Sequence, residues 1–121
     1  MSRTSSKKNR PFSDGIIKVD SKTGKALGFT SDKFEGDIGP MVGSYLWKDG
    51  NRILVSLVTS VHPGQGNLSK LFATIESKGY RVAVPTPLGH MQQILEAKGF
   101  KPHWEKTEVD ESCEVWEKPT P

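Results

Sequence analysis

The segment RILVSLVTSVHPGQGNLSKLFATIESKG, residues 52–79, decides the fold because it passes from an apolar strand through a glycine-rich turn into a helix. Residues 53–61 are rich in β-branched and aliphatic side chains, which favour a strand, and the His62-Pro63 pair should end it. Gly64 and Gly66 allow a tight turn whose backbone can approach a ligand closely. Apolar residues then recur at helical spacing, at Leu68, Leu71, Phe72 and Ile75, which predicts an amphipathic helix.

The start of this predicted helix is suited to binding an anion. The first amide groups of a helix have no partners within the helix, and they carry the positive end of the helix dipole. A phosphate group beside residues 64–69 would therefore be stabilised, and Asn67 or Ser69 could cap the helix. An ordinary strand-to-helix connection without a ligand explains the same residues, so the turn alone does not assign a function.

Two common phosphate-binding motifs do not fit the turn. A P-loop needs a lysine and a serine or threonine after its second glycine, but Asn67-Leu68 follow Gly66. A dinucleotide-binding motif needs an acidic residue about 20 positions further on, where Pro85 and Pro87 stand instead. Nucleotide hydrolysis of the P-loop kind and hydride transfer are therefore disfavoured.

The rest of the chain predicts a small mixed α/β domain. The Asp49-Gly50 pair favours a hairpin between two neighbouring strands, and the strand, helix and strand that follow form a parallel crossover. A second short hairpin and a loop are expected before them. The predicted strands are 16–19, 26–29, 42–48, 52–61, 80–84, 101–106 and 113–118, the helices start near residues 67 and 90, and the loop covers residues 30–40.

Length and composition limit the class of protein. We expect one domain over residues 15–121, preceded by a flexible basic arm over residues 1–14. No apolar run is long enough for a membrane span, and the polar start lacks the apolar centre of a secretion signal, so we expect a cytoplasmic protein with no membrane partner. The single cysteine, Cys113, excludes an internal disulfide, and the three histidines show no ligand spacing, so we predict no metal site.

The positive charge of the chain is concentrated near its start. Residues 1–25 contain seven Lys or Arg against two Asp or Glu, while the whole chain has a net charge of +3. A basic arm of this kind can lie along the phosphates of a nucleic acid, and it can equally serve only to keep the chain in solution. Nucleic acid is therefore a possible partner through this arm.

The order of elements from Gly43 to Trp116 resembles the GCN5-related N-acetyltransferase (GNAT) superfamily. In that family a strand leads through a glycine-rich turn into a helix whose amides hold the pyrophosphate of acetyl-CoA, and a later helix ends in a Gly-Phe pair, here Gly99-Phe100. The resemblance implies an α/β fold with a mixed, mostly antiparallel central sheet, one splayed parallel strand pair and two flanking helices. The cofactor-binding positions it implies are Val58, Thr59, Ser60, Val61, Gly64, Gln65, Gly66, Asn67, Leu68 and Ser69.

The resemblance also implies an activity, the acyl-CoA-dependent acylation of an amine on a small molecule, a protein or a nucleobase. A strand amide, of Val58 or Thr59, would stabilise the thioester oxygen during attack by the amine. The family often uses a tyrosine in the second helix to protonate the leaving thiolate, and Leu95 stands at that position here.

Substitutes for the missing acid or base are scarce in the sequence. His62, His90 and Ser56 are the candidates, and each is also explained as a structural or solvated residue. The alternative function is a catalytically inactive module with the same fold that binds nucleic acid or a protein partner.

Overall fold

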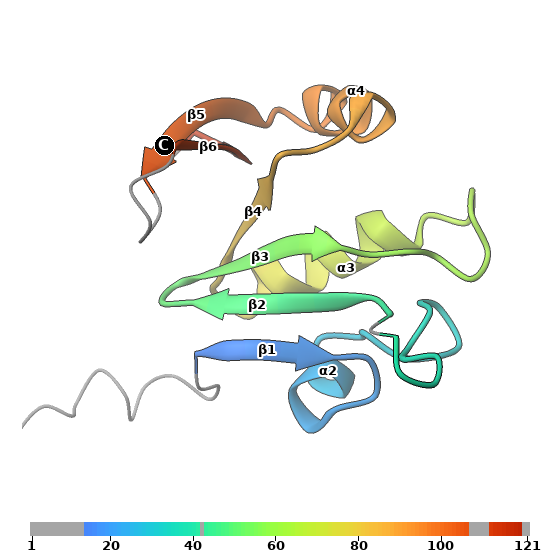
Figure 1. Ribbon diagram of the computed structural model, residues 1–121. Helices are drawn as coiled ribbons and strands as arrows, with labels where there is room; N and C mark the ends of the chain where they lie inside the picture. Colours follow the sequence, from blue (N-terminus) through green and yellow to red (C-terminus); the bar gives the residue numbers. More distant parts are fainter. Residues whose placement is uncertain (1–13, 42, 107–111, 120–121) are drawn as a thin grey trace, which may run out of the picture.

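The computed structural model describes residues 14–41, 43–106 and 112–119, which form one six-stranded sheet and three helices (Figure 1). The strands lie in the order β1-β2-β3-β4-β6-β5, and only β3 and β4 are parallel neighbours. The strands are β1 (Gly15–Lys18), β2 (Tyr45–Asp49), β3 (Arg52–Leu57), β4 (Arg81–Pro85), β5 (Lys101–Lys106) and β6 (Ser112–Glu117). The helices are α2 (Lys22–Ala26), α3 (Asn67–Ser77) and α4 (Gly89–Ala97).

The predicted mixed α/β class is confirmed, as are the β2–β3 hairpin and the β3–α3–β4 crossover. The hairpin turns at Gly50, whose positive φ of 62° suits a residue without a Cβ. Gly79 and Gly99 follow α3 and α4 with φ of 89°, a left-handed conformation that ends a helix. These glycines explain why the helix ends could be placed from the sequence.

The parallel contact between β3 and β4 is short. The paired residues are Arg52 with Arg81, Ile53 with Val82 and Leu54 with Ala83, and no further pair joins these two strands among the described residues. Beyond Ala83, β4 continues only as the neighbour of β6, to which it pairs as far as Pro85. The two strands therefore separate after three residue pairs, at the end that leads into α3 and α4 (Figure 1).

The hydrophobic core lies on the face of the sheet that the helices cover. Helix α3 contributes Leu71, Phe72 and Ile75 to it, and the rings of Phe72 and Phe100 lie 5.6 Å apart. Leu95 of α4 is fully buried in the same cluster. Burying these side chains, at about 1.5–3 kcal/mol each, holds the helices to the strands.

Leu54 and Val58 make both faces of residues 53–61 fairly apolar, which favours a central strand covered on two sides, but the second face of the sheet is only partly covered. Ile53 and Val55 of β3 are buried, but Ser56 is exposed on the opposite face. On the same open face Ile16 and Trp47, which pair across β1 and β2, are 48% and 45% exposed.

The short hairpin predicted from residues 16–19 and 26–29 is also wrong. β1 pairs with β2, and residues 22–26 form the helix α2. The Ser21 Oγ accepts a hydrogen bond of 3.0 Å from the Gly24 amide and so caps this helix. Gly24 is buried against the carbonyl of Lys18, where a Cβ would lie 2.4 Å from the oxygen. The glycine therefore fits α2 onto β1 and does not form a hairpin turn.

The loop over residues 30–40 and the end of β3 lie next to each other in the fold. Residues 30–40 form a loop as predicted, and Phe34 in it makes an isolated bridge with Ser60. β3 itself ends at Leu57, four residues earlier than predicted.

No helix in the described part of the chain combines the length and the hydrophobicity needed to cross a lipid bilayer.

Candidate functional site

The glycine-rich turn stands open at the start of α3. Gly64 and Gly66 have φ of 86° and 74°, and a Cβ on either would meet no atom within 4 Å. The side chains of residues 61–66 are exposed, Gln65 among them. Both glycines are therefore explained by backbone conformation, and the space beside them is free for a ligand among the described residues.

The N-terminus of α3 has no side-chain cap, which corrects the expectation that Asn67 or Ser69 provides one. Gly66 is the N-cap residue, and its carbonyl accepts the first helical hydrogen bond, 3.0 Å from the Lys70 amide. The buried Asn67 side chain donates to the Ser60 Oγ at 3.1 Å instead, which ties the helix start to the end of the strand. The amides of the first turn are left as free donors within the described chain.

A lysine missed by the sequence reasoning lies at the same helix start. The Lys98 ammonium, from the C-cap of α4, donates a 2.6 Å hydrogen bond to the Ser69 Oγ in the first turn of α3. A cation and the positive end of a helix dipole therefore lie together, which favours an anion there. Residues 69 and 98 lie 29 positions apart and are brought together only by the fold, so no local motif could have identified this lysine.

Residues 58–61, which follow β3, direct their backbone groups alternately to two opposite sides. Thr59 and Val61 point to one of these sides. The Thr59 amide donates to the Ser44 Oγ at 2.8 Å, and the Thr59 carbonyl accepts from the Glu35 amide at 2.9 Å. The Val61 amide is bonded to the Lys33 carbonyl at 2.8 Å. Thr59 and Val61 therefore direct their backbone groups towards Ser44 and the loop 33–35.

Val58 and Ser60 present their backbone groups in the opposite direction. Ser60 is opposed to Phe34 in an antiparallel bridge whose two hydrogen bonds are made by the residues on either side, so its own amide points away from Phe34. Successive residues of an extended chain alternate, and Val58 shares the orientation of Ser60. Neither amide has a hydrogen-bond partner in the described part of the chain, and both face the side on which β3 and β4 separate.

The predicted catalytic candidates are not assembled into one group. His62 lies in the turn, His90 is the second residue of α4 and Ser56 lies in β3, and all three side chains are exposed. No hydrogen bond or ion pair joins any two of them in the part of the chain described here. Leu68, the remaining predicted contact, packs against the core through its side chain and offers a ligand only its backbone.

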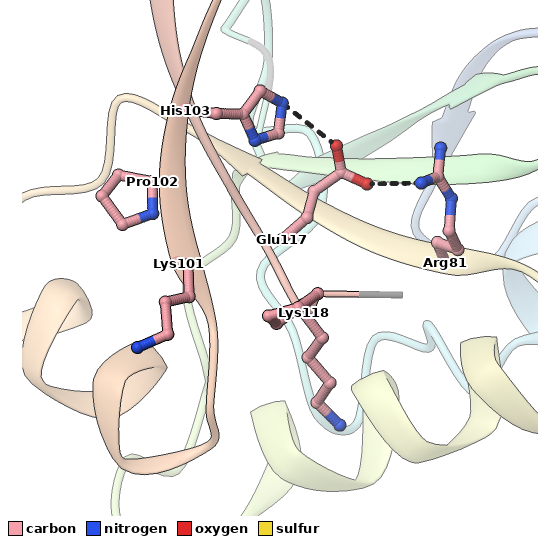
Figure 2. Close-up of a pocket in the computed structure, with 7 residues that line it drawn as sticks. Arg81, Lys101, Pro102, His103, Glu117 and Lys118 are labelled. Carbon is pink, nitrogen blue, oxygen red and sulfur yellow. Dashed lines mark ion pairs between the residues drawn. The ribbon is translucent and has the colours of Figure 1, made fainter. Parts of the chain in front are cut away.

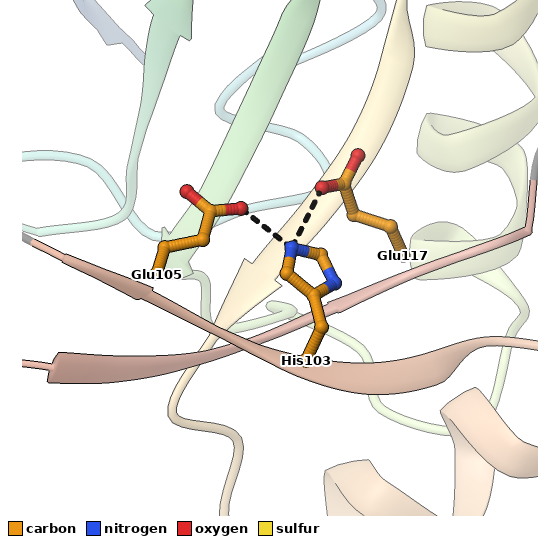
Figure 3. A group of neighbouring side chains, drawn as sticks. All are labelled: His103, Glu105 and Glu117. Carbon is orange, nitrogen blue, oxygen red and sulfur yellow. Dashed lines mark hydrogen bonds and ion pairs between the residues drawn. The ribbon is translucent and has the colours of Figure 1, made fainter.

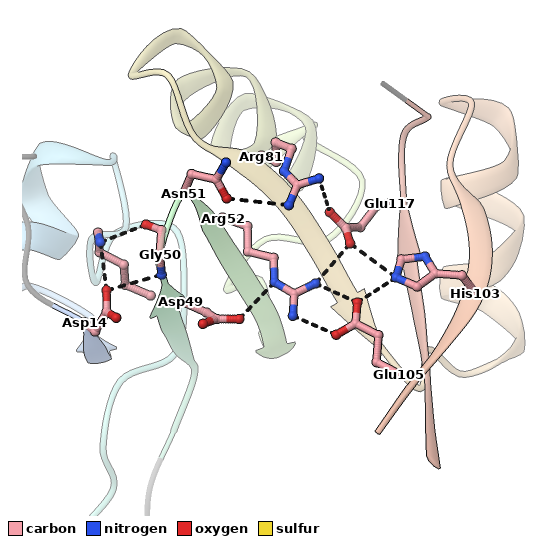
Figure 4. A network of polar contacts seen from close by, with 10 residues as sticks. Asp14, Asp49, Gly50, Asn51, Arg52, Arg81, His103, Glu105 and Glu117 are labelled. Atoms are coloured by element: carbon pink, nitrogen blue, oxygen red, sulfur yellow. Dashed lines mark hydrogen bonds and ion pairs between the residues drawn. The ribbon is translucent and has the colours of Figure 1, made fainter. Parts of the chain in front are cut away.

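A second polar cluster, which the sequence analysis did not predict, crosses the sheet at the opposite end of β3 (Figure 4). Arg52 holds Glu105 of β5 through two parallel hydrogen bonds of 2.7 and 2.8 Å, and its Nη1 also lies 3.0 Å from the Glu117 Oε2 of β6. The Arg52 Nε bonds Asp49 at 3.0 Å. The hydrogen bond to Arg52 lowers the pKa of Glu105 to about 2, and the same bond raises the pKa of Arg52 above its usual range.

Glu105 and Glu117 also form, together with His103 of β5, a group of possible metal ligands (Figure 3). The His103 Nε2 lies 2.6 Å from the Glu105 Oε2 and 3.4 Å from the Glu117 Oε2, and the three groups each offer one atom within 4.8 Å of the others. The sequence shows no ligand spacing around the histidines, but the fold brings His103 next to these two carboxylates. The Arg52 guanidinium, at 2.7 and 3.0 Å from the same carboxylate oxygens, already supplies their positive partner. We interpret the group as part of an ion-pair network.

The lowered pKa of Glu105 predicts a loss of stability in acid. Because the folded pKa of about 2 lies below the ordinary value of 4.5, the ion pair contributes fully above pH 4.5 and is lost as the pH falls towards 2. Urea unfolding at pH 6, 4.5, 3.5 and 2.5 should therefore show a difference between the wild-type chain and Glu105→Gln that shrinks steadily with pH. A difference that stays constant over this range would contradict the assigned pair.

Comparison of the chain with protein-family models, with curated proteins and with solved structures gave no match in any of the three.

Proposed function

We propose that the chain is an acyl-CoA-dependent N-acyltransferase of the GNAT type, with acetyl-CoA as its cofactor. The observation that carries the proposal is the uncapped start of α3, which follows an open glycine turn at the end where β3 and β4 separate. A diphosphate placed there would accept hydrogen bonds from the amides of Asn67, Leu68 and Ser69. Lys98 would add a positive charge beside the same turn.

The parted strands support the position of the acyl group in this proposal. A pantetheine arm that runs from the helix start towards β3 would meet the free amides of Ser60 and Val58. Since the Thr59 amide is bonded to Ser44, Val58 is the better of the two predicted donors to the thioester oxygen. That amide would stabilise the negative charge that develops on this oxygen when an amine attacks the carbonyl carbon.

The chemical step requires no covalent intermediate on the protein. The amine nitrogen forms a bond to the acyl carbon, the carbon-sulfur bond breaks, and the amine proton passes to solvent or to an exposed base. The thiolate of CoA leaves and takes a proton from water in this scheme, because the side chain at the position of the family's tyrosine is the fully buried Leu95. Leu95 also favours the alternative, a module that binds the cofactor or another partner without turnover.

Two variants at one position test cofactor binding with the fold held constant. Asn and Asp have the same shape and both tolerate the left-handed backbone of Gly66, but only Asp adds a negative charge where the diphosphate would lie. In a calorimetric titration with acetyl-CoA, Gly66→Asp should bind at least about tenfold more weakly than Gly66→Asn, a difference of about 1.4 kcal/mol.

Two results would count against the transferase. Equal affinities of the two Gly66 variants would show that the diphosphate does not bind at this turn. If the wild-type chain gives no heat at millimolar acetyl-CoA, acetyl-CoA is not its cofactor. If acetyl-CoA binds, release of CoA thiol in the presence of small amines, a lysine peptide or single-stranded DNA separates the transferase from the inactive module.

A further inference from the structure

A hollow of about 290 Å³ lies at the end of the sheet where β4 and β5 begin and β6 ends (Figure 2). Its walls are formed by Arg81, Lys101, His103, Glu117 and Lys118 together with two proline rings. Because β3 and β4 are parallel and the glycine turn follows the end of β3, the hollow and the turn lie at opposite ends of the strands. The hollow is therefore separate from the proposed acyl-CoA site.

The charges that line the hollow are mainly positive. Arg81, Lys101 and Lys118 come from the start of β4, the start of β5 and the residue after β6. Lys101 makes no ion pair with any other described residue, so its full charge is available to a ligand. Lys118 lies over the ring of Phe100 and pairs with Glu76 of α3 at 3.0 Å, which fixes its side chain at the rim.

The one carboxylate in the lining is already neutralised. Glu117 is 8% exposed, and its Oε2 lies 3.0 Å from the Arg52 Nη1. Its Oε1 is buried and forms a 3.4 Å ion pair with the Arg81 Nη1 but no hydrogen bond among the described residues. The negative charge of Glu117 is therefore compensated by two guanidinium groups, and the lysines in the lining favour an anion in the hollow.

We propose that this hollow binds the phosphate group of a small phosphorylated compound. Two lysines and an arginine from three elements line the hollow and supply the charges that recognise phosphate oxygens, and the proline rings offer an apolar wall to the rest of the ligand. The volume lies at the lower end of the range for small-molecule sites, so the ligand is small.

The test uses the full chain labelled with ¹⁵N and titrated with inorganic phosphate and with glycerol 3-phosphate, each against sodium chloride at the same ionic strength. Both phosphates should give saturable amide shifts centred on residues 101–103 and 117–118, and glycerol alone should give none. Lys101→Gln should weaken the binding of phosphate about threefold, as expected for one solvated charge. Lys22→Gln, which removes an exposed lysine on α2, is the matched control and should bind like the wild-type chain.

Several results would overturn the proposal. They are shifts that chloride reproduces, shifts that do not saturate, and an equal effect of the Lys22 and Lys101 variants. If a DNA oligonucleotide shifts the same amides at lower concentration than either phosphate, the assignment to a small molecule is wrong. Gly66→Asp changes a residue at the other end of the strands. The same titration of this variant therefore measures phosphate binding in the hollow independently of acetyl-CoA binding at the turn.

Discussion

Replacing Gly43 with alanine should lower the free energy of unfolding by about 3 kcal/mol, the upper range for overpacking. A Cβ at this position would lie 1.9 Å from the carbonyl oxygen of Gly36, 2.3 Å from its carbonyl carbon and 2.9 Å from the carbonyl oxygen of Glu35. All three atoms belong to the backbone, so the strain cannot be relieved by rotating a side chain. Thermal and urea unfolding of the variant measure the loss.

The effect should extend towards the proposed acyl-CoA site. Glu35 accepts a 2.7 Å hydrogen bond from the Ser44 amide, and the Ser44 Oγ accepts from the Thr59 amide. Displacing this loop would break the hydrogen bond from the Thr59 amide to Ser44 and shift the backbone next to Val58. Gly36→Ala is the matched control, because its Cβ would meet only Val19 at 3.7 Å, and it should change stability by less than about 1 kcal/mol. Similar stabilities of the two variants would show that the loop yields without strain.

Replacing Arg52 with methionine should lower the free energy of unfolding by about 2 kcal/mol. Methionine keeps the aliphatic stem of the side chain but removes the bonds to Glu105, Glu117 and Asp49. Glu117 would remain buried with two ion-pair contacts at 3.4 Å, to Arg81 and His103. The estimate is below the range for a fully buried pair, because Arg52 and Glu105 keep 16% and 30% of their side-chain surface.

Two comparisons make this prediction specific. Arg81→Met removes an exposed arginine with a single longer ion pair to the same carboxylate, and it should cost less than about 1 kcal/mol. Adding Glu105→Gln and Glu117→Gln to Arg52→Met should recover part of the loss, because the two carboxylates that lost their guanidinium partner are then neutral. If the triple variant is no more stable than Arg52→Met, the uncompensated carboxylates are not the cause.

Most of the elements around the turn could be predicted because their signals are local. The Asp-Gly hairpin, the helical spacing of Leu71, Phe72 and Ile75, and the glycines after both helices each act within a few residues. Helix α2 was missed because its polar, glycine-containing sequence is typical of a turn, and its helical form depends on Gly24 packing against β1. The early end of β3 likewise depends on a distant partner, the loop at Phe34.

The candidate site was predictable only in its backbone part. Gly64 and Gly66 signal a turn that can face a ligand, but which strand amides are free depends on Ser44 and Lys33, which lie elsewhere in the sequence. The alternation of His103 and Glu105 on a predicted strand could have placed them on one face. Glu117 and Arg52 join them only because β6 lies between β4 and β5. Predicting that cluster requires the strand order, which spacing within the sequence does not contain.

The three residue pairs that connect β3 to β4 have a mechanical consequence. They join two half-sheets, β1-β2-β3 and β4-β6-β5, and Arg52 fastens the halves on one side of this short seam through Glu105 and Glu117. The backbone pairing of the two half-sheets is therefore supplemented by ion pairs at one end of β3. Their opposite ends, beside the proposed acyl-CoA site, are left without such a connection among the described residues.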